Sequence, residues 1–270
     1  MSKTIVITGA STGIGKETAI YFARKGWNVA ATMRKPNATE WRNYKNVKVY
    51  ALDVLDNEAI INVAAKIIED FIKIDVIVNN AGYGLIGCFE NATREQILRQ
   101  FNTNVFGLMD VTRAFLPHFR EHKSGTIINV ASVAGRTTFP LYSLYHSTKW
   151  AVEGFSESLS YELRQFRIRV KIIEPGPIKT DFYERSQDLI KAKNGSEYDS
   201  YTKRVYPFLQ KAGLGAVGPR VVAKKIFKAA NDSSNKIRYP IGGGASALLF
   251  LRRLIGDRLF IRIVRIVSGA

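Results

Sequence analysis

Short apolar segments alternate with longer amphipathic segments along most of the chain. Six of the apolar segments are rich in β-branched residues with little polar alternation, which is typical of strands buried in a parallel sheet. These six are Ile5–Thr8, Trp27–Thr32, Val47–Leu52, Ile74–Asn79, Thr126–Ala131 and Ile168–Ile173, and a short seventh strand is predicted at Lys236–Pro240. Apolar positions at helical spacing predict helices over Ile14–Lys25, Asn57–Lys73, Arg94–Arg120 (ended or kinked at Pro117), Tyr145–Gln165 and Val221–Ala230.

The repeated strand–helix units define the expected fold class. Units of this length connect parallel strands through right-handed crossovers. They predict an α/β, single-domain Rossmann fold over residues 1–270, with a doubly wound, mostly parallel sheet of about seven strands flanked by helices. We expect a cofactor-binding half over about residues 1–125 and a catalytic and substrate-binding half over about 126–270.

Two segments of the second half depart from this alternation of strands and helices. Residues 177–215 are polar, aromatic and lysine-rich, show no clear strand, and follow the carboxyl end of a predicted strand. An α/β enzyme places a substrate lid at such a point, so we expect a lid here. Residues 245–267 are apolar with interspersed arginines and predict a C-terminal helical tail.

Composition indicates an ordinary globular protein. Hydrophobic residues make up 46% of the 270 positions and charged residues 23%. The single cysteine, Cys88, cannot form an intrachain disulfide, which fits a reducing compartment, and we expect a cytoplasmic protein. The first apolar segment is too short for a signal peptide, and no apolar run reaches the roughly 18 residues of a membrane span.

The formal net charge of +17 admits several kinds of partner. The basic residues are spread along the chain without a zinc-finger, RNA-recognition or basic-zipper pattern, so we expect no nucleic-acid partner. A phosphorylated cofactor, an anionic substrate or a membrane surface would also suit a positive field. In the tail, Arg258, Arg262 and Arg265 recur at helical spacing, opposite apolar residues. We expect this helix to pack on the core, the cleft or a partner subunit; peripheral contact with a membrane is the alternative.

A glycine-rich turn follows the first predicted strand and opens the first helix. Its spacing is G-x-x-x-G-x-G, with Gly9, Gly13 and Gly15 as the glycines. Glycines let the backbone turn sharply and approach a pyrophosphate closely, and a helix N-terminus supplies N–H groups and a positive dipole end. The residues expected to hold the cofactor phosphates are Gly9, Ser11, Thr12, Gly13, Ile14 and Gly15.

The end of the second predicted strand bears on the choice of cofactor. An acidic residue there would hold the adenosine ribose of NAD, but the sequence continues Thr32-Met33-Arg34-Lys35. Arg34 can pair with a 2′-phosphate and stack on adenine. NADP(H) is therefore the favoured cofactor, with NAD(H) still possible.

Candidate catalytic groups also fall at the carboxyl ends of predicted strands. Tyr145 and Lys149 lie one helical turn apart, and Ser132 follows the fifth strand. Reduction of a carbonyl needs a hydride and a proton, and an ordinary tyrosine has a pKa of about 10. A nearby ammonium lowers that pKa, and a serine hydroxyl can hydrogen-bond an oxygen that gains negative charge.

Together these motifs resemble the short-chain dehydrogenase/reductase family over roughly residues 1–180. The resemblance implies that Tyr145 is the proton donor and acceptor, that Ser132 positions the substrate carbonyl, and that Lys149 binds the nicotinamide ribose. Asn104 would hold a water in a proton relay. The motifs are Thr8-Gly9-x-x-x-Gly13-Ile14-Gly15, Asn79-Asn80-Ala81-Gly82, Asn104, Ser132, Tyr145-x-x-x-Lys149 and Pro175-Gly176.

The same resemblance implies further contacts. Asp53 and Val54 would contact the adenine. The remaining cofactor residues would be Asn80, Ala81 and Gly82 near the adenosine ribose, and Pro175, Gly176, Ile178 and Thr180 near the nicotinamide amide. One departure is mild: Ala131 stands where many members have a second serine. A homodimer or homotetramer is implied, through the helices around residues 94–120 and 145–165.

The expected function is therefore NADP(H)-dependent interconversion of a secondary alcohol and a ketone or aldehyde, on a lipophilic small molecule. The segments Ala30–Arg34 and Tyr239–Gly242 resemble the subgroup around 17β-hydroxysteroid dehydrogenases. The alternative is a non-catalytic NADP-binding regulator or scaffold that retains the fold. The pattern H-x-x-E-H at His118–His122 occurs in one metalloprotease class, but no third ligand is evident. We interpret it as a solvated helix terminus, expect no metal, and interpret His146 as a neighbour of Tyr145 rather than a catalyst.

Overall fold

Parallel strands form the centre of the molecule in the computed structural model, which describes residues 2–179, 187–190, 197–212 and 215–270. Thr180, one of the expected cofactor residues, lies outside the described residues. The strands pair in the order β3-β2-β1-β4-β6-β7-β9, and every neighbouring pair is parallel. They are β1 (Thr4–Ile7), β2 (Asn28–Met33), β3 (Val47–Ala51), β4 (Val76–Asn79), β6 (Gly125–Val130), β7 (Ile168–Pro175) and β9 (Arg238–Ile241).

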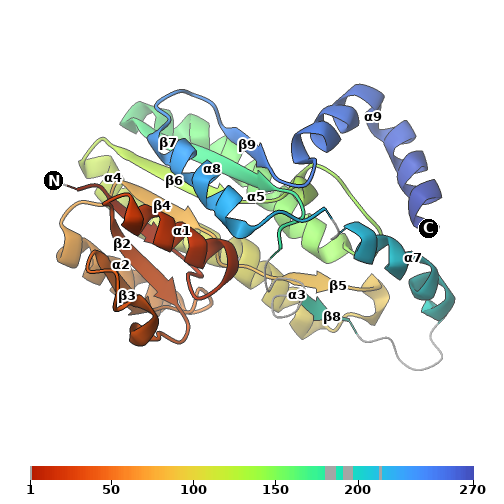
Figure 1. Ribbon diagram of the computed structural model, residues 1–270, viewed down its shortest axis with the longest axis horizontal. Coiled ribbons are helices and arrows are strands. Elements are labelled where there is room, and N and C mark those ends of the chain that lie inside the picture. The colour runs from red at the N-terminus through yellow and green to blue at the C-terminus, as the bar shows by residue number, and fades with distance from the viewer. Residues whose placement is uncertain (1, 180–186, 191–196, 213–214) are drawn as a thin grey trace.

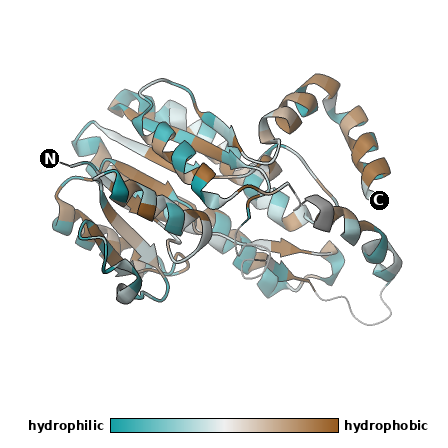
Figure 2. Ribbon diagram, in the orientation of Figure 1, coloured by the Kyte–Doolittle hydropathy of each residue, from teal (hydrophilic) through white to brown (hydrophobic). Residues whose placement is uncertain are grey.

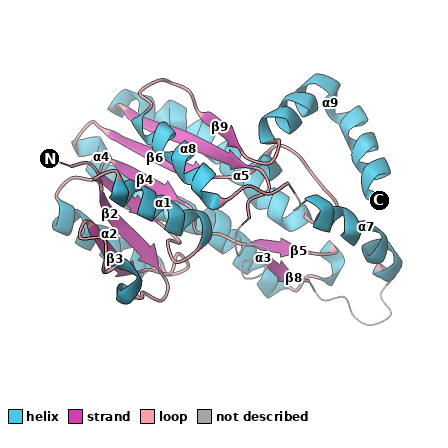
Figure 3. Cartoon of the chain, in the orientation of Figure 1, coloured by secondary structure: helices cyan, strands magenta, loops and turns pink. Residues whose placement is uncertain are grey.

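Helices cover both faces of this sheet (Figures 1 and 3). One face packs against α1 and α8, and the other against α2, α4 and α5. The helices are α1 (Gly13–Arg24), α2 (Asn57–Phe71), α3 (Arg94–Phe101), α4 (Gly107–Glu121), α5 (Ser143–Leu163), α7 (Asp199–Ala212), α8 (Pro219–Asn231) and α9 (Ala245–Ser268).

The two apolar layers explain why the strands lack polar alternation. Successive residues of β1 point to opposite faces, so Ile5 and Ile7 pack with Phe22 of α1 while Val6 packs with Phe115 of α4. Both directions lead into a core, and apolar residues are therefore required at every position. The predicted α/β fold class is confirmed, and the observed sheet is wholly parallel.

The order of the strands indicates where in the molecule a cofactor would bind. From β1 the chain builds outward to β2 and β3, and then returns to the other side of β1 with β4. A crevice forms outside the carboxyl ends of the strands where the order reverses in this way, and ligands bind there in open α/β sheets. The glycine-rich turn lies at this switch point, between β1 and α1.

Two predictions about helices and strands need correction. The segment 94–120 is not one helix, because the π-helical turn η3 (Asn102–Phe106) separates α3 from α4, and α4 continues through Pro117. The segment 177–215 does contain a strand, since β8 (Gln187–Leu189) pairs with β5 (Gly84–Ile86) in a second, two-stranded sheet. Its partner lies about a hundred residues earlier in the sequence, and Asp188 of β8 forms an ion pair with Arg99 of α3. Local sequence patterns carry no information on such pairing.

The C-terminal tail is helical as predicted. The helix α9 bends at Gly256, whose φ of +67° and ψ of 179° are outside the helical region. Figure 1 shows the two arms of α9 at one end of the molecule, beyond β9 and beside α7. None of the helices in the described part of the chain is both long and apolar enough to cross a membrane.

Candidate active site

A cleft of about 640 Å³ opens at the carboxyl ends of the parallel strands. It brings together residues that are far apart in the sequence but share this edge of the sheet. Nearly all of the predicted site residues line it, namely Gly9, Ser11, Thr12, Gly13, Ile14, Arg34, Asp53, Val54, Asn80, Ala81, Gly82, Ser132, Tyr145, Lys149, Pro175, Gly176 and Ile178. Gly15 and Asn104 are not in the lining and lie behind it, where both are buried.

The glycine-rich turn is held in shape by the protein itself. The amide nitrogen Nδ2 of Asn80 donates to the carbonyl oxygens of Thr8 (2.9 Å) and Gly9 (3.2 Å). The Thr8 hydroxyl accepts from the backbone N–H groups of Asn80 and Ala81 at 3.0 Å each. A Cβ at Gly15 would lie only 2.3 Å from the Gly9 carbonyl oxygen, so the turn leaves no room for a side chain there. The two hydrogen bonds from the Asn80 side chain therefore hold the backbone of this tight turn in place.

These residues fit the phosphates of a dinucleotide. Gly9 and Gly13 adopt φ values of +66° and +55°, a conformation that glycine reaches without strain. The first turn of α1 contains no acidic residue, and the side chain of its N-cap, Thr12, forms no capping hydrogen bond. The N–H groups and positive dipole end of α1 thus face the cleft without a competing carboxylate. Arg34, exposed after β2, adds a positive charge at the same cleft.

Lys149 lies buried on α5, one turn after Tyr145. Its ammonium nitrogen Nζ donates to the Val130 carbonyl oxygen (2.9 Å) and lies 5.8 Å from the centroid of the Tyr145 ring. Desolvation lowers the pKa of Lys149 to about 8, although the negative charge of Glu153 raises it. The amine is therefore largely charged at neutral pH, and a charge at this place favours the tyrosinate form of Tyr145.

Ser132 lies at the end of β6, where it caps the short helix η4 (Val133–Gly135). Its hydroxyl accepts from the Ala134 N–H (3.1 Å) and donates to the Pro175 carbonyl oxygen (3.2 Å). These contacts connect β6 to β7 and hold the half-buried hydroxyl at the wall of the cleft. The predicted trio of Ser132, Tyr145 and Lys149 thus meets in one place.

Asn104 belongs to the π-helical turn and not to a regular helix. Its side chain donates to the Tyr83 carbonyl oxygen (2.8 Å) and to the Thr148 hydroxyl (3.1 Å), and accepts from the Tyr83 N–H (3.0 Å). The amide group is therefore fully engaged in joining η3 to the loop after β4 and to α5. Thr148 directly precedes Lys149, so Asn104 supports α5 next to Lys149.

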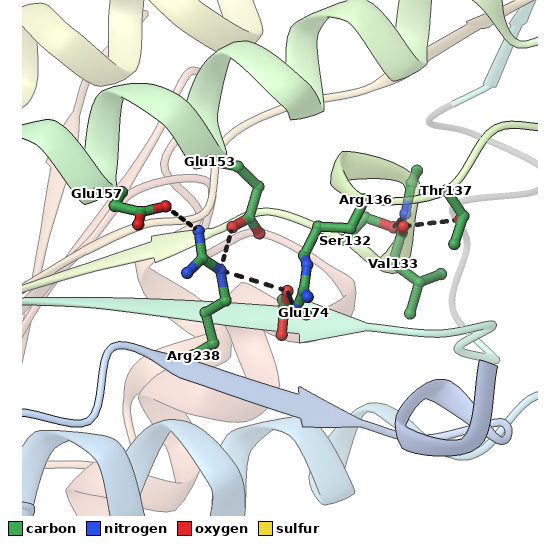
Figure 4. A network of polar contacts seen from close by, with 9 residues as sticks. Ser132, Val133, Arg136, Thr137, Glu153, Glu157, Glu174 and Arg238 are labelled. Atoms are coloured by element: carbon green, nitrogen blue, oxygen red, sulfur yellow. Dashed lines mark hydrogen bonds and ion pairs between the residues drawn. The ribbon is translucent and has the colours of Figure 1, made fainter. Parts of the chain in front are cut away.

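A partly buried charge network beside α5 was not expected from the sequence (Figure 4). Arg238 of β9 donates to Glu153 (2.9 Å) and Glu157 (2.6 Å), both on α5, and Arg136 donates to Glu174 of β7 (3.2 Å). Desolvation and the neighbouring Glu174 raise the pKa of Glu153 to about 7, and desolvation also raises the pKa of Glu174. Glu153 lies one turn after Lys149, a spacing that could have been noticed, but its partner Arg238 is 85 residues away.

The histidines have structural contacts. His118 is buried and its Nε2 accepts from the Ile74 N–H (3.1 Å), so its interpretation as a solvated helix terminus is wrong. Burial lowers the pKa of His118. His146 is also buried, with Nδ1 bonded to the Ala134 carbonyl oxygen (2.7 Å) and Nε2 accepting from the Phe139 N–H (3.1 Å). Within the described residues no group of three metal-binding side chains occurs.

The wholly parallel sheet, the switch-point cleft and the glycine-rich turn define a dinucleotide-binding α/β protein of the Rossmann type. The model of the short chain dehydrogenase family matches residues 3–189, about two thirds of the chain. The protein belongs to this family and is an oxidoreductase that acts on CH–OH groups with a nicotinamide cofactor.

Relatives of the chain come from distant organisms. An uncharacterized oxidoreductase of Schizosaccharomyces pombe is 40% identical over 230 residues, which cover 85% of this chain and 96% of the relative. A 3-ketodihydrosphingosine reductase of Bacteroides thetaiotaomicron is 34% identical over 239 residues, covering 88% and 87% of the two chains.

Solved structures share the whole architecture. A short-chain dehydrogenase from Streptomyces avermitilis superposes with a TM-score of 0.86 at 32% identity, covering 99% of this chain and 98% of its own. The protein ElxO, solved with NADP bound, has a TM-score of 0.77 at 29% identity, covering 92% and 100% of the two chains. Both likenesses extend over the sheet and the cleft, because nearly the entire chain is matched.

Proposed function

We propose that this protein is an NADP(H)-dependent oxidoreductase that interconverts a secondary alcohol with a ketone, or a primary alcohol with an aldehyde, on a lipophilic small molecule. One observation carries the proposal. The cleft that contains the glycine cradle also contains Tyr145, Lys149 and Ser132, with the Lys149 ammonium beside the tyrosine ring. A protein that only bound the cofactor would have no use for a buried lysine beside a tyrosine.

The three side chains have separate tasks in the proposed reduction. NADPH, when bound, supplies the hydride. The Tyr145 hydroxyl gives its proton to the carbonyl oxygen as that oxygen becomes an alkoxide, and the product is the neutral alcohol. The Ser132 hydroxyl donates a hydrogen bond to the same oxygen. The Lys149 ammonium stabilises the tyrosinate that remains, which regains a proton from solvent.

Arg34 is the residue that we propose to select NADP(H). It is exposed at the cleft directly after β2, and no carboxylate occupies the segment 32–35. The complex of ElxO with NADP shows that this fold accommodates that cofactor in a related chain. Asp53 and Val54 line the cleft nearby and are proposed to contact the adenine.

Replacing Arg34 with alanine is expected to raise the KM for NADPH while leaving that for NADH unchanged. A hydrogen bond to a charged phosphate is strong, so its loss should weaken the binding of NADPH by roughly 10- to 100-fold. Lys35→Ala is the matched control, since Lys35 is equally basic and exposed but does not line the cleft. Steady-state kinetics with both cofactors measure the effect, and an equal loss for NADPH and NADH would contradict this role for Arg34.

Aromatic side chains support a lipophilic substrate. Tyr83, Phe139, Tyr142 and Phe208 line the cleft. The relative named as a 3-ketodihydrosphingosine reductase acts, by its name, on a ketone of a long-chain base. We therefore propose a ketone or aldehyde with an apolar body as the substrate class; the resemblance to the 17β-hydroxysteroid dehydrogenase subgroup stays a prediction.

The test is NADPH oxidation, followed by absorbance, against a panel of aliphatic ketones, aldehydes, long-chain keto-lipids and steroids. Turnover of at least one apolar carbonyl is expected, with NADPH preferred to NADH. Tight NADPH binding without turnover of any compound, in both reaction directions, would favour the non-catalytic regulator instead.

Replacing Glu153 with glutamine is expected to shift the alkaline limb of the pH–rate profile toward lower pH. The negative charge of Glu153 raises the pKa of Lys149, which is about 8. Without that charge the ammonium loses its proton at lower pH, and its support of the tyrosinate is lost earlier as pH rises. Glu157→Gln is the control, because Glu157 also pairs with Arg238 but is half exposed. Coincident profiles of the wild type and Glu153→Gln would show that this carboxylate does not tune Lys149.

Self-association through α4 and α5 is also proposed. Phe106, Trp150 and Tyr161 expose 52%, 47% and 72% of their surface on η3 and α5. Exposed large aromatic side chains are enriched at protein interfaces. Light scattering on the purified protein distinguishes the expected homodimer or homotetramer from a monomer.

A further inference from the structure

The helix α9 carries an apolar surface that the rest of the chain leaves uncovered. Figure 1 shows its two arms standing away from the sheet, and Figure 2 shows that both arms are largely hydrophobic. One narrow stripe is packed: Ala245 and Leu249 against Val133 of η4, and Phe260 and Ser268, both buried, in the second arm. The core therefore covers only a few of the apolar residues of this helix, and the expected packing on a partner subunit stays a prediction.

Some of the exposed apolar residues form a stripe on each arm, and others, such as Ile261, are exposed outside it. Phe250 and Leu254, one turn apart, are 68% and 70% exposed in the first arm. In the second arm Leu259 and Ile263 are 48% and 38% exposed, and Ile266, a further turn on, is 72% exposed. Spacings of three and four residues keep these side chains on one face of a helix. The face is apolar and protrudes, which suits a soft surface better than a shaped pocket.

Arginines form a third stripe beside it. Arg258, Arg262 and Arg265 follow one another at spacings of four and three residues, and all three are exposed. Among the described residues of α9, only Arg252 forms an ion pair, with Asp257 (2.7 Å). Asp257 is also the one acidic residue among the five arginines of this helix, and the whole chain has a net charge of +17. The exposed arginines thus lack acidic partners on their own helix.

We propose that α9 lies on the surface of an anionic lipid bilayer, with its apolar stripe in the interface and its arginines at the lipid phosphates. An amphipathic helix with these two faces binds a bilayer in the plane of the interface. A second copy of the chain is a poor occupant. Pairing α9 with itself would gather ten arginines and only two aspartates, and like charges oppose such an interface.

The second arm of α9 contacts aromatic residues of the cleft, so docking of α9 would bring the cleft close to the bilayer. The ring centroid of Phe260 lies 6.5 Å from that of Phe139. The ring centroid of Phe139 lies 6.2 Å from that of Phe208 on α7. Phe139 and Phe208 both line the cleft. The helix on the bilayer is therefore in contact with the aromatic wall of the candidate active site, and an apolar substrate can reach that wall from the lipid.

Flotation with vesicles tests the docking without any assay of activity. We expect the full-length protein to float with vesicles of phosphatidylcholine mixed with phosphatidylglycerol, less with phosphatidylcholine alone, and less at high salt. The double variant Leu254→Glu with Ile266→Glu should lose at least about tenfold of the partitioning, because each change removes exposed aliphatic surface and adds a repelled charge. Ile61→Glu with Val221→Glu makes the same change on exposed positions of α2 and α8, and should bind as the wild type does.

The arginines are tested separately. Changing Arg258, Arg262 and Arg265 to glutamine should weaken partitioning on anionic vesicles by roughly 100-fold. Circular dichroism and thermal unfolding establish that each variant is folded. Wild-type protein that stays in the soluble fraction, or α9 variants that float as well as the control pair, would overturn the proposal. Dissociation of an oligomer by the Leu254 and Ile266 changes, without vesicle binding by the wild type, would assign the stripe to a second copy and also overturn it.

Delivery of substrate from the bilayer rests on the proposed function and has its own measurement. With a long-chain ketone embedded in anionic vesicles, the Leu254→Glu, Ile266→Glu variant should show a raised apparent KM, while its turnover of a short water-soluble ketone matches the wild type. Equal KM values for the embedded ketone would overturn delivery. A wild type that floats but reduces neither ketone would instead count against the proposed function.

Discussion

Replacing Tyr145 with phenylalanine is expected to lower kcat by about 1,000-fold or more, in line with what a positioned acid or base contributes. The change removes one hydroxyl and keeps the ring that faces Lys149, so the cleft retains its shape. Binding of NADPH, measured by quenching of protein fluorescence, should be essentially unchanged. The loss should therefore appear in kcat rather than in the affinity for the cofactor.

Tyr142→Phe is the matched control for this experiment. Tyr142 lines the same cleft, and its ring centroid lies 6.1 Å from that of Tyr145. Removal of its hydroxyl should change kcat far less, because the Lys149 ammonium lies beside the Tyr145 ring. If Tyr145→Phe turned over as fast as the wild type, or if Tyr142→Phe lost more, the proton would have to come from another group.

Replacing Gly15 with alanine is the second large effect that we expect, on cofactor binding and stability together. The added Cβ would lie 2.3 Å from the Gly9 carbonyl oxygen and 2.6 Å from the Asn80 amide nitrogen. Real Cβ contacts are not this short, and the first of these atoms belongs to the backbone, so the turn itself must move. Overpacking of this kind costs about 1–3 kcal/mol of unfolding free energy. Since the same backbone forms the phosphate cradle, NADPH affinity should fall by roughly 100-fold or more, as when several hydrogen bonds to charged groups are misplaced.

Gly218→Ala controls for the loss of a glycine as such. Nothing lies within 4 Å of a Cβ at Gly218, and its φ of −64° and ψ of 151° are open to alanine. As it is the N-cap of α8, we expect at most about 1 kcal/mol of destabilisation and no change in NADPH binding. Isothermal titration and chemical unfolding measure both quantities. Wild-type affinity in Gly15→Ala would show that the turn does not hold the cofactor.

The sequence predicted the parts of this molecule that local patterns determine. The buried strands were found because apolar residues such as Ile5, Val6 and Ile7 run without a polar break, as two covered faces require. The glycine turn and the trio of Ser132, Tyr145 and Lys149 were found because each group lies at the end of a strand or on the next helix, and a parallel sheet brings such ends together.

Contacts between distant residues account for what was missed. The π-helical turn at Asn104 follows from bonds to Tyr83 and Thr148, and neither partner is indicated by local propensity. His118 was assigned to solvent because periodicity could not show that its ring meets the Ile74 N–H. His118 lies on a helix as predicted, but on the buried face of that helix instead of the exposed one. What covers the apolar side of α9 was left open, because apolar positions predict burial only when another surface is available to cover them.

The edge strand β9 holds Arg238, which pairs with the buried Glu153 of α5 and lies 4.0 Å from Glu174, whose nearer partner is Arg136. This strand is also the last to leave the ribosome, more than sixty residues after the carboxyl end of β7. A nascent chain shorter than about 240 residues has all of its predicted catalytic side chains, yet it would leave the buried Glu153 without its arginine, at a cost of several kcal/mol. The order of synthesis therefore delays the pairing of Glu153 until β9 joins the sheet, so a truncated product of translation is expected to be less stable than the whole chain.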